Sequence, residues 1–408
     1  MLVRAAAFFK GGLSRAGIWG LFPQSLKSGY ANLAATPYTD GTAAGPGKKG
    51  VYTWLIHMYP PKHNAGAEWM AHAMNTYLVR KKRGEANVVV NENDVDSFEQ
   101  VPLINRSKAA AVHAAVASSS VLLSHLDMEP CALKTARLCR KPLVLVVHNS
   151  FRYSYLKKFK KRLPGNLYLI HNSKWIEEFY TPLGLPSIVV HPPVDADAYA
   201  TASSREYVTL VNLSKDKGGA VFREIARLMP DTKFLGVKGA YEEQIVTPLG
   251  NVTIVENTPN IKEIYGRSAI VLMPSMYESW GRVAVEAMAS GIPVVAHPTN
   301  GLKESCSYAG IYCDRDEPEE WVGEIRRLQS DPAYYEQRAA ACRRRARELD
   351  PQSQLASMAD WLERLRWNEP ATESSKRLNR LFRRPSNNAL QRTPFRGAAE
   401  RERSATKA

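Results

Sequence analysis

Two carboxylates, Glu278 and Glu286, stand eight residues apart in the segment 273–295. The pattern predicts a strand that ends near Met273, a loop that holds Glu278, and a helix that begins near Gly281 and holds Glu286. The free backbone N–H groups and the positive dipole end of a helix that starts at a glycine can bind a phosphate. The stretch therefore predicts an anion site between two acids. The simpler alternative is an amphipathic helix with two solvated glutamates.

His148 is a further candidate because it ends the apolar run 143–147, where a strand is expected. A lone histidine is often structural, but its ordinary pKa lies close enough to neutral pH for acid–base or hydrogen-bonding roles in a site. A basic cluster follows at 157–162, in which five of six residues are Lys or Arg and aromatic residues come just before. This cluster suits an anionic lipid surface or a phosphate-bearing ligand, and its simpler interpretation is a solvated helix face.

The elements that position these residues follow from an alternation of short apolar runs with amphipathic stretches, which is typical of βαβ units. In the first half we expect strands at 51–57, 87–90, 121–125, 143–148, 167–171 and 187–191. The alternation then restarts, with strands at 207–213, 233–236, 252–255, 269–273, 292–296 and 310–313. Helices are expected at 66–83, 105–118, 333–349 and 352–367.

The predicted fold class is α/β, with two domains of parallel sheet that face a cleft. The first domain is expected at 51–200 and the second at 201–350, followed by a C-terminal helix at 351–367. Parallel α/β domains bind ligands at the carboxyl ends of their strands, so this cleft would collect the candidate groups. The flanking segments 1–50 and 368–408 are basic and are expected to be disordered extensions.

The charge of the chain is concentrated at its ends. The 408 residues carry a net charge of +15, of which +5 lies in 1–49 and +8 in 376–408. Basic ends suit a polyanion or an anionic membrane, although a charge run is more often a solvated tail. Residues 1–39 contain no acid and are either a targeting segment or a passive extension.

Apolar runs and cysteines argue against three other classes of protein. No run approaches the ~20 apolar residues of a membrane-spanning helix, so an integral membrane protein is not expected. The five cysteines include no Cys-x-x-Cys pair, which argues against a disulfide framework and a zinc ribbon. A reducing, cytoplasmic compartment is the simplest interpretation.

The segment 274–304 resembles the signature of glycosyltransferase family 4, also called glycosyl transferases group 1. It has the form Pro-Ser-x-x-Glu-Ser-Trp-Gly-x-x-x-x-Glu-Ala-Met-Ala-x-Gly-x-Pro-Val-Val, and Gly-Leu-Lys-Glu follows at 301–304. Enzymes of this family are retaining transferases with two Rossmann-like domains, the GT-B architecture. The resemblance covers roughly 51–350 and is densest at 270–304. It implies a metal-independent hexosyltransferase that uses a nucleoside diphosphate sugar and no further cofactor.

The resemblance also implies a role for each matching residue. Glu278 and His148 would lie by the donor sugar and are the two candidate catalytic residues. Glu286 would accept hydrogen bonds from the nucleotide ribose. The other donor-binding positions would be Gly66 in the first domain, Lys217 on the diphosphate, and Gly281, Arg282 and Val283 at the helix start.

At one position the chain departs from the family pattern. Asn212 stands where the family commonly has arginine, so half of the usual cation pair for the leaving diphosphate is missing. We predict that Arg282 supplies the charge, with Lys215 and Lys238 as alternatives. Glu304 matches a further family acid, or it is a charge near a helix N-terminus.

The expected function is retaining sugar transfer to a glycan or lipid-linked acceptor, by a cytoplasmic protein that contacts anionic membranes peripherally. Nucleic acid is not expected as a partner. A nucleotide-sugar epimerase on the same fold is one alternative, and a non-catalytic module that binds polyanions or glycans is another. Three Asp-x-Asp triplets also keep open a metal-dependent, single-domain type of glycosyltransferase, at 94–96, 195–197 and 314–316.

Overall fold

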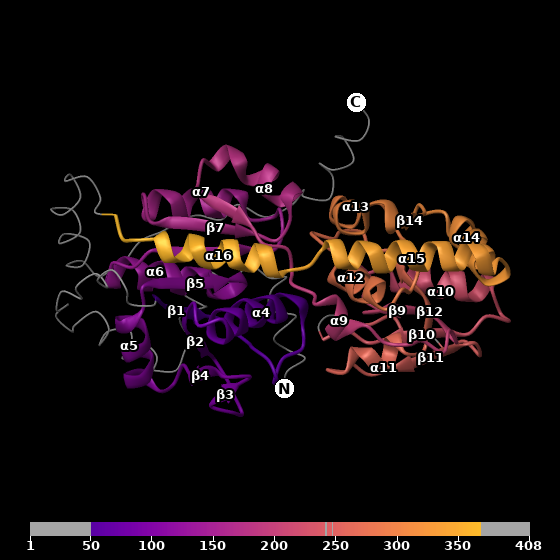
Figure 1. Ribbon diagram of the computed structural model, residues 1–408, viewed down its shortest axis with the longest axis horizontal. Coiled ribbons are helices and arrows are strands. Elements are labelled where there is room, and N and C mark those ends of the chain that lie inside the picture. The colour runs from indigo at the N-terminus through magenta and orange to yellow at the C-terminus, as the bar shows by residue number, and fades with distance from the viewer. Residues whose placement is uncertain (1–49, 241–242, 247, 369–408) are drawn as a thin grey trace, which may run out of the picture. The chain divides into compact units, whose positions relative to one another are not determined.

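The computed structural model describes residues 50–240, 243–246 and 248–368. The predicted basic extensions lie outside this range except for one residue at each end. Within it the chain forms two β-sheets with helices packed against them (Figure 1). No helix in the described ranges has both the length and the hydropathy needed to cross a membrane.

The first sheet has the spatial strand order β3-β4-β2-β1-β5-β6-β7-β8. Its strands are β1 (Gly50–Leu55), β2 (Gly84–Val90), β3 (Ser97–Phe98), β4 (Val101–Asn105), β5 (Val121–His125), β6 (Leu143–Val147), β7 (Leu167–His171) and β8 (Ser187–Val189). Neighbouring strands run parallel except for β3 with β4. Strands β5, β6 and β7 are buried at every position, as expected for parallel strands covered on both faces.

The helices of this first domain connect successive strands. They are α4 (Gly66–Arg80), α5 (Ala109–Ser118), α6 (Glu129–Cys139), α7 (Tyr153–Arg162) and α8 (Lys174–Tyr180), with short 3₁₀ turns at Leu126–Met128 and Thr181–Leu183. Met70, Met74 and Leu78 recur every four residues along α4 and are fully buried. This spacing places them on one face of the helix, which packs on the sheet.

The second sheet has the strand order β11-β10-β9-β12-β13-β14, and all of its neighbouring pairs are parallel. Its strands are β9 (Tyr207–Val211), β10 (Phe234–Val237), β11 (Val252–Val255), β12 (Ser268–Met273), β13 (Val294–Ala296) and β14 (Ile311–Tyr312). The helices around it are α9 (Ala196–Tyr199), α10 (Gly219–Leu228), α11 (Ile261–Tyr265), α12 (Arg282–Ala289), α13 (Asn300–Cys306), α14 (Pro318–Ser330) and α15 (Pro332–Glu348).

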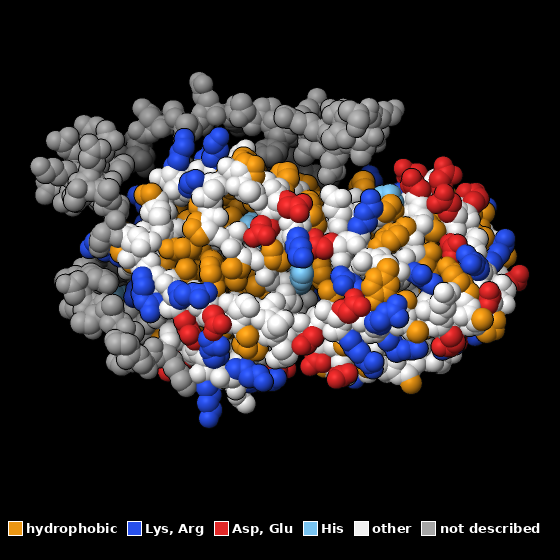
Figure 2. Space-filling view, turned by 45° about the horizontal axis from the view of Figure 1, so that its top comes forward, with side chains coloured by type: hydrophobic (Ala, Val, Ile, Leu, Met, Phe, Trp, Pro, Cys, Tyr) orange, Lys and Arg blue, Asp and Glu red, His pale blue; other side chains and the backbone are white. Residues whose placement is uncertain are grey.

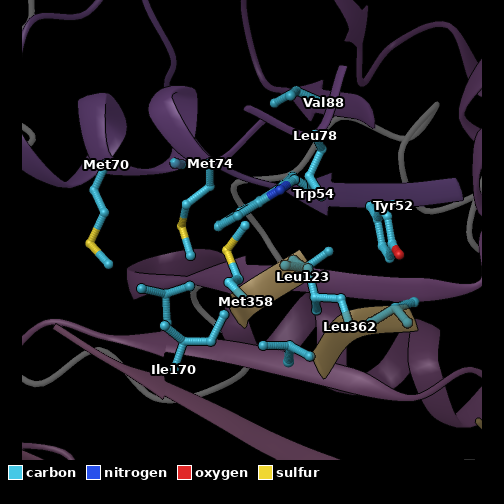
Figure 3. Close-up of a cluster of buried hydrophobic side chains, with 14 of the residues drawn as sticks. Tyr52, Trp54, Met70, Met74, Leu78, Val88, Leu123, Ile170, Met358 and Leu362 are labelled. Carbon is cyan, nitrogen blue, oxygen red and sulfur yellow. The ribbon is translucent and has the colours of Figure 1, made fainter. Parts of the chain in front are cut away.

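The last described helix, α16 (Gln352–Arg364), follows α15 in sequence but packs on the first domain. Met358 and Leu362 are 1% exposed or less and share one apolar cluster with Trp54 and Leu123 (Figure 3). Burying a Met or Leu side chain stabilises a fold by about 2 kcal/mol. The apolar face of α16 therefore packs the last described helix against the first domain.

The predicted helix at 105–118 is present, but its predicted start was wrong and the strand before it was not predicted. The predicted helix was to start at residue 105, but strand β4 ends at Asn105 and α5 begins only at Ala109. The Oδ1 atom of Asn105 accepts hydrogen bonds from the backbone N–H and the hydroxyl of Ser107, which forms a turn between the two elements. The short strand was missed because the apolar helix next to it dominates the local pattern.

Candidate active site

The loops that follow the strands of both sheets meet through hydrogen bonds. The hydroxyl oxygen of Tyr277, after β12, accepts from the backbone N–H of Ser150, after β6, at 2.9 Å. The side-chain amide of Asn172, after β7, donates to the hydroxyl of Ser279 at 2.7 Å. These loops all leave the carboxyl ends of parallel strands, which is where such sheets bind ligands.

Glu278 lies in the loop after β12 and is held on one carboxylate oxygen. Its Oε1 atom accepts from Nζ of Lys217 at 2.5 Å and from the hydroxyl of Ser275 at 3.0 Å. The side chain of Glu278 is 11% exposed and that of Lys217 is 34% exposed. Two residues predicted separately therefore form one ion pair, and its lysine remains accessible from solvent.

Glu286 lies on α12 and has partners on both oxygens. Arg282 donates to it from Nε at 2.5 Å, and the hydroxyl of Tyr265 donates to the second oxygen at 2.9 Å. Each carboxylate oxygen carries two lone pairs, so further donors can still be accommodated. The carboxylate is 6% exposed, and burial together with Glu286 raises the pKa of Tyr265 well above its usual range.

The guanidinium of Arg282 lies between the carboxylate of Glu286 and the hydroxyl of Tyr199, the last residue of α9. Its Nη2 atom donates to the hydroxyl of Tyr199 at 2.5 Å, while Nη1 has no hydrogen-bond partner among the described residues. Burial lowers the pKa of an arginine, but the charge of Glu286 and the bond to Tyr199 outweigh it and raise the pKa of Arg282. The guanidinium is therefore a fixed cation with one N–H group to spare.

Gly281 and Gly66 lie at the starts of α12 and α4, the two helix starts that were predicted to bind the donor. Gly281 precedes α12 with a φ of +93°, and a Cβ there would stand 2.5 Å from the side chain of Leu302. Both features require glycine whether or not a ligand binds. The backbone of Arg282 and Val283 opens α12 directly after it. At Gly66, the first residue of α4, a Cβ would meet nothing within 4 Å, so that helix start is open.

Asn212 follows β9 in the left-handed region, with a φ of +73°. Its Oδ1 atom accepts from the backbone N–H of Ser214 at 3.0 Å, closing an Asx turn. Asparagine adopts this conformation more readily than arginine, which gives a local structural reason for the residue found here. Of the alternative cations, Lys215 is exposed in the same turn, and Lys238 pairs with Glu256 at 2.6 Å.

Glu304 lies on α13 and serves the first domain. Its carboxylate accepts from the backbone N–H groups of Lys174 and Trp175 at 2.8 and 3.1 Å, and from His191 at 3.0 Å. Burial raises the pKa of Glu304, but the bonds from His191 and the two amides outweigh it, so the pKa is lowered. Glu304 thus completes the start of α8 rather than that of its own helix.

His148 directly follows β6 and contacts a histidine that the sequence analysis did not single out. Its Nε2 atom lies 3.0 Å from Nδ1 of His125, the last residue of β5. Burial, followed by the charge of Arg152, lowers the pKa of His148 to about 4. The sequence pattern could have identified His125, since it ends an apolar run just as His148 does. Strands β5 and β6 are neighbours in the sheet and bring these two positions together.

The Asp-x-Asp triplet at 94–96 is used for ion pairs. Asp94 pairs with Lys62 at 2.9 Å and Asp96 with Lys108 at 3.1 Å. Within the ranges that the structure describes, no group of three or more His, Cys, Asp or Glu side chains is arranged to hold a metal ion.

Residues 243–349, which hold Glu278, Glu286 and Glu304, match the family model for glycosyl transferases group 1. The predicted family resemblance is confirmed. Curated relatives named D-inositol 3-phosphate glycosyltransferase match within part of their length. The protein from Thermomonospora curvata is 32% identical over 114 residues, 26% of each chain. That from Mycolicibacterium vanbaalenii is 27% identical over 184 residues, 36% of this chain and 41% of the relative. The chain thus spans less than half the length of these two relatives.

Solved structures of glycosyltransferases share the fold over their whole length. Anabaena Alr3699/HepE in complex with UDP and glucose has a TM-score of 0.61 at 16% identity and covers 77% of this chain and 99% of its own. WaaG, a glycosyltransferase involved in lipopolysaccharide biosynthesis, has a TM-score of 0.56 at 14% identity and covers 76% and 99%. The predicted α/β class with two parallel-sheet domains in the GT-B arrangement is confirmed.

Proposed function

We propose that this protein transfers a sugar from a nucleoside diphosphate sugar to a glycan or lipid-linked acceptor, with retention of configuration and without a metal ion. The observation that carries the proposal is the Lys217–Glu278 ion pair, formed between the loop that leads to α10 and the loop that leads to α12. The pair joins a cation suited to the diphosphate with a carboxylate suited to the sugar, and Glu278 lies in the segment that matches the family model. Because the curated relatives match over only part of their length, the activity of the whole chain is a proposal that the experiment below tests.

The diphosphate is proposed to bind at the start of α12. The backbone N–H groups of Arg282 and Val283 open the helix, and the helix dipole favours an anion there. The ammonium group of Lys217 would then donate a hydrogen bond to a phosphate oxygen, and its bond to Glu278 would weaken or break. Fixed donors of this kind stabilise the charge that develops on a leaving group, and this is the role a metal ion has in other transferases.

Arg282 is proposed to supply the charge that Asn212 lacks. Among the residues that the structure describes, its Nη1 group has no hydrogen-bond partner, while its other two nitrogens are held by Glu286 and Tyr199. A guanidinium fixed in this way can donate to an anion without first losing another bond. The same contacts give Arg282 a structural role, because it neutralises a buried carboxylate.

On the sugar, Glu278 and His148 are proposed to act differently. The carboxylate of Glu278 favours the positive charge of an oxocarbenium-like transition state. His148 has a pKa of about 4 and is neutral at physiological pH, so it acts as a hydrogen-bonding group on the donor rather than as a general acid.

A peripheral membrane contact of a cytoplasmic protein is proposed through α7. Lys157, Lys158, Lys161 and Arg162 are exposed on this helix, and Phe151 just before it is 61% exposed. On the face in Figure 2, Lys and Arg side chains are interspersed with Asp and Glu, so this face is not uniformly positive. The local cluster on α7 is therefore the feature assigned to anionic lipid.

The test is a panel of UDP-, GDP- and ADP-sugars with and without acceptor, in buffer that contains EDTA. Sugar transfer with at least one donor is expected. Conversion of the donor into its epimer without an acceptor, or no turnover with any donor, would contradict the proposal.

A further inference from the structure

Two histidine side chains, buried His125 and partly buried His148, meet at the carboxyl edge of the first sheet. His125 is 2% exposed and ends β5, and His148 follows the neighbouring strand β6. Nδ1 of His125 and Nε2 of His148 are 3.0 Å apart, with the ring planes at 61°. The edge of Trp54 packs against His125, with ring centroids 6.0 Å apart. His125 is thus held on one side by the core and on the other by His148.

The two loops that leave these histidines are tied together a second time. Arg152, four residues after His148, donates from Nη2 to the carbonyl oxygen of Leu126 at 3.2 Å and pairs with buried Glu129 at 2.8 Å. Leu126 has a φ of +52°, a left-handed conformation that is unfavourable for a non-glycine residue. Strain of this kind persists only where surrounding contacts impose it, and it clusters at functional sites.

Neutral rings give the His125–His148 contact a chemical consequence. Burial and the neighbouring histidine lower the pKa of His125 well below its usual range. Burial, followed by the charge of Arg152, lowers the pKa of His148 to about 4. A hydrogen bond between two neutral imidazoles contains one proton. Whichever ring donates it, the bond determines whether Nδ1 of His148 carries a proton or a lone pair.

We propose that His125 is a positioning residue that restricts His148 to one ring orientation and one tautomer, so that its Nδ1 atom always presents the same group to the donor sugar. The effect on turnover rests on the proposed function. The effect on the tautomer does not, and the two are measured separately.

The tautomer is measured by long-range ¹⁵N–¹H spectra of the full chain labelled on its nine histidines, with His148 assigned by a His148→Gln variant. Phenylalanine at 125 keeps the contact with Trp54 and removes the ring nitrogens, whereas asparagine places a polar atom near the position of Nδ1. His148 is expected as one tautomer in the natural chain and in His125→Asn, and as a mixture in His125→Phe. An unchanged His148 spectrum in folded His125→Phe would overturn the proposal.

The matched control is His171→Phe. His171 also ends a buried strand of the same sheet and is 1% exposed, but it stacks on Tyr180 and makes no bond to His148. Its replacement is expected to leave the His148 spectrum unchanged. A tautomer mixture in this variant as well would show a general effect of core replacement and would also overturn the proposal.

Turnover is the second readout. With a donor found in the panel, His125→Phe is expected to lower kcat by about tenfold to a hundredfold, the range for losing the partner of an active-site histidine, with KM for the donor nearly unchanged. His125→Asn should recover most of kcat. Equal kcat in His125→Phe and the natural chain would overturn the proposal. Absence of turnover in the natural chain would instead refute the proposed function, and the spectra would still decide the role of His125.

Discussion

The two sheets present opposite chemistry at their carboxyl edges. At the first, His125 and His148 are neutral rings joined by a hydrogen bond. At the second, Lys217 pairs with Glu278 and Arg282 with Glu286. A diphosphate needs fixed positive charge, whereas a sugar hydroxyl is recognised by neutral donors and acceptors. On the proposed function, the charged edge binds the diphosphate and places Glu278 by the sugar, while the neutral rings offer hydrogen bonds to the sugar.

The two ion pairs at the charged edge differ in how easily they can exchange a partner for a ligand. Glu286 is enclosed, with partners on both oxygens, while Lys217 is one third exposed and bonds a single oxygen of Glu278. A buried pair that loses one member leaves an uncompensated charge, and an accessible pair can exchange partners at much lower cost. The Arg282–Glu286 pair therefore has a structural role, and the Lys217–Glu278 pair is suited to ligand exchange.

The largest effect is expected for Arg282→Ala. Removing this guanidinium leaves Glu286 buried without its cation, so the free energy of unfolding should fall by about 3–5 kcal/mol. Chemical denaturation of the variant measures it. The double variant Arg282→Met with Glu286→Gln should recover much of the loss. If the single variant is as stable as the natural chain, the pair is not the structural element described.

The role of Asn212 sharpens the same comparison. If Arg282 supplies the missing charge, Asn212→Arg should partly restore kcat/KM for the donor in an Arg282→Lys chain, which keeps the charge but not the fork. The rescue should be incomplete because arginine is strained at a φ of +73°. A double-mutant cycle measures the coupling, and strictly additive effects would assign the compensation to Lys215, Lys238 or backbone amides.

At the exchangeable pair, Glu278→Gln is expected to lower kcat by about 10²–10³-fold, the range for losing one preorganised transition-state group. Glu286→Gln should act mainly on KM for the donor. Steady-state kinetics with varied donor separates the two. Glu206→Gln is the matched control, since Glu206 pairs with Lys233 at 3.0 Å in the same domain. Near-normal kinetics for both site variants would favour a binding module.

The neutral edge predicts a dependence of stability on pH. His171 is 1% exposed, and burial lowers its pKa to about 4. Between pH 6.5 and 4 the unfolded chain binds a proton that the folded chain does not, so stability falls as the pH falls. This histidine should contribute roughly 3 kcal/mol to the loss. His171→Phe should show a correspondingly flatter profile of unfolding free energy, and an identical profile would refute the assignment.

The smallest effect concerns the lipid surface. Each exposed cation on α7 should contribute up to about 1 kcal/mol to binding of anionic vesicles at low salt. Replacing Lys157, Lys158 and Lys161 by Gln should weaken vesicle sedimentation. Lys81, Lys82 and Lys108, exposed elsewhere in the first domain, provide the matched triple control. Sedimentation that is independent of anionic lipid or salt would remove the membrane proposal.

Local pattern was sufficient for much of the fold and for the position of the glutamates. Apolar runs located β5, β6, β9 and β12, and the glycine before α12 marked the helix that holds Glu286. It failed at β4, where a short alternating strand stands next to an apolar helix. The distinguishing signal there spans only a few residues, too few for the two-residue period to stand out.

Contacts between distant segments could not be predicted from one sequence. Tyr199 and Tyr265 reach Arg282 and Glu286 from other helices, and Glu304 bonds the start of α8 in the first domain. The left-handed backbone of Asn212 was equally hidden. Its side chain was interpreted as a missing charge, whereas the structure adds a turn that favours asparagine. Residue type alone does not separate these two reasons.

The most direct test of the central claim is the anomeric configuration of the product formed in the presence of EDTA. Proton NMR of the transferred sugar reports it through the coupling between the first two ring protons. With phosphates bound by Lys217 and the start of α12, the reaction should proceed without a metal ion and the product should keep the configuration of the donor. An inverted product, or turnover that returns only when Mg²⁺ or Mn²⁺ is added, would contradict the account.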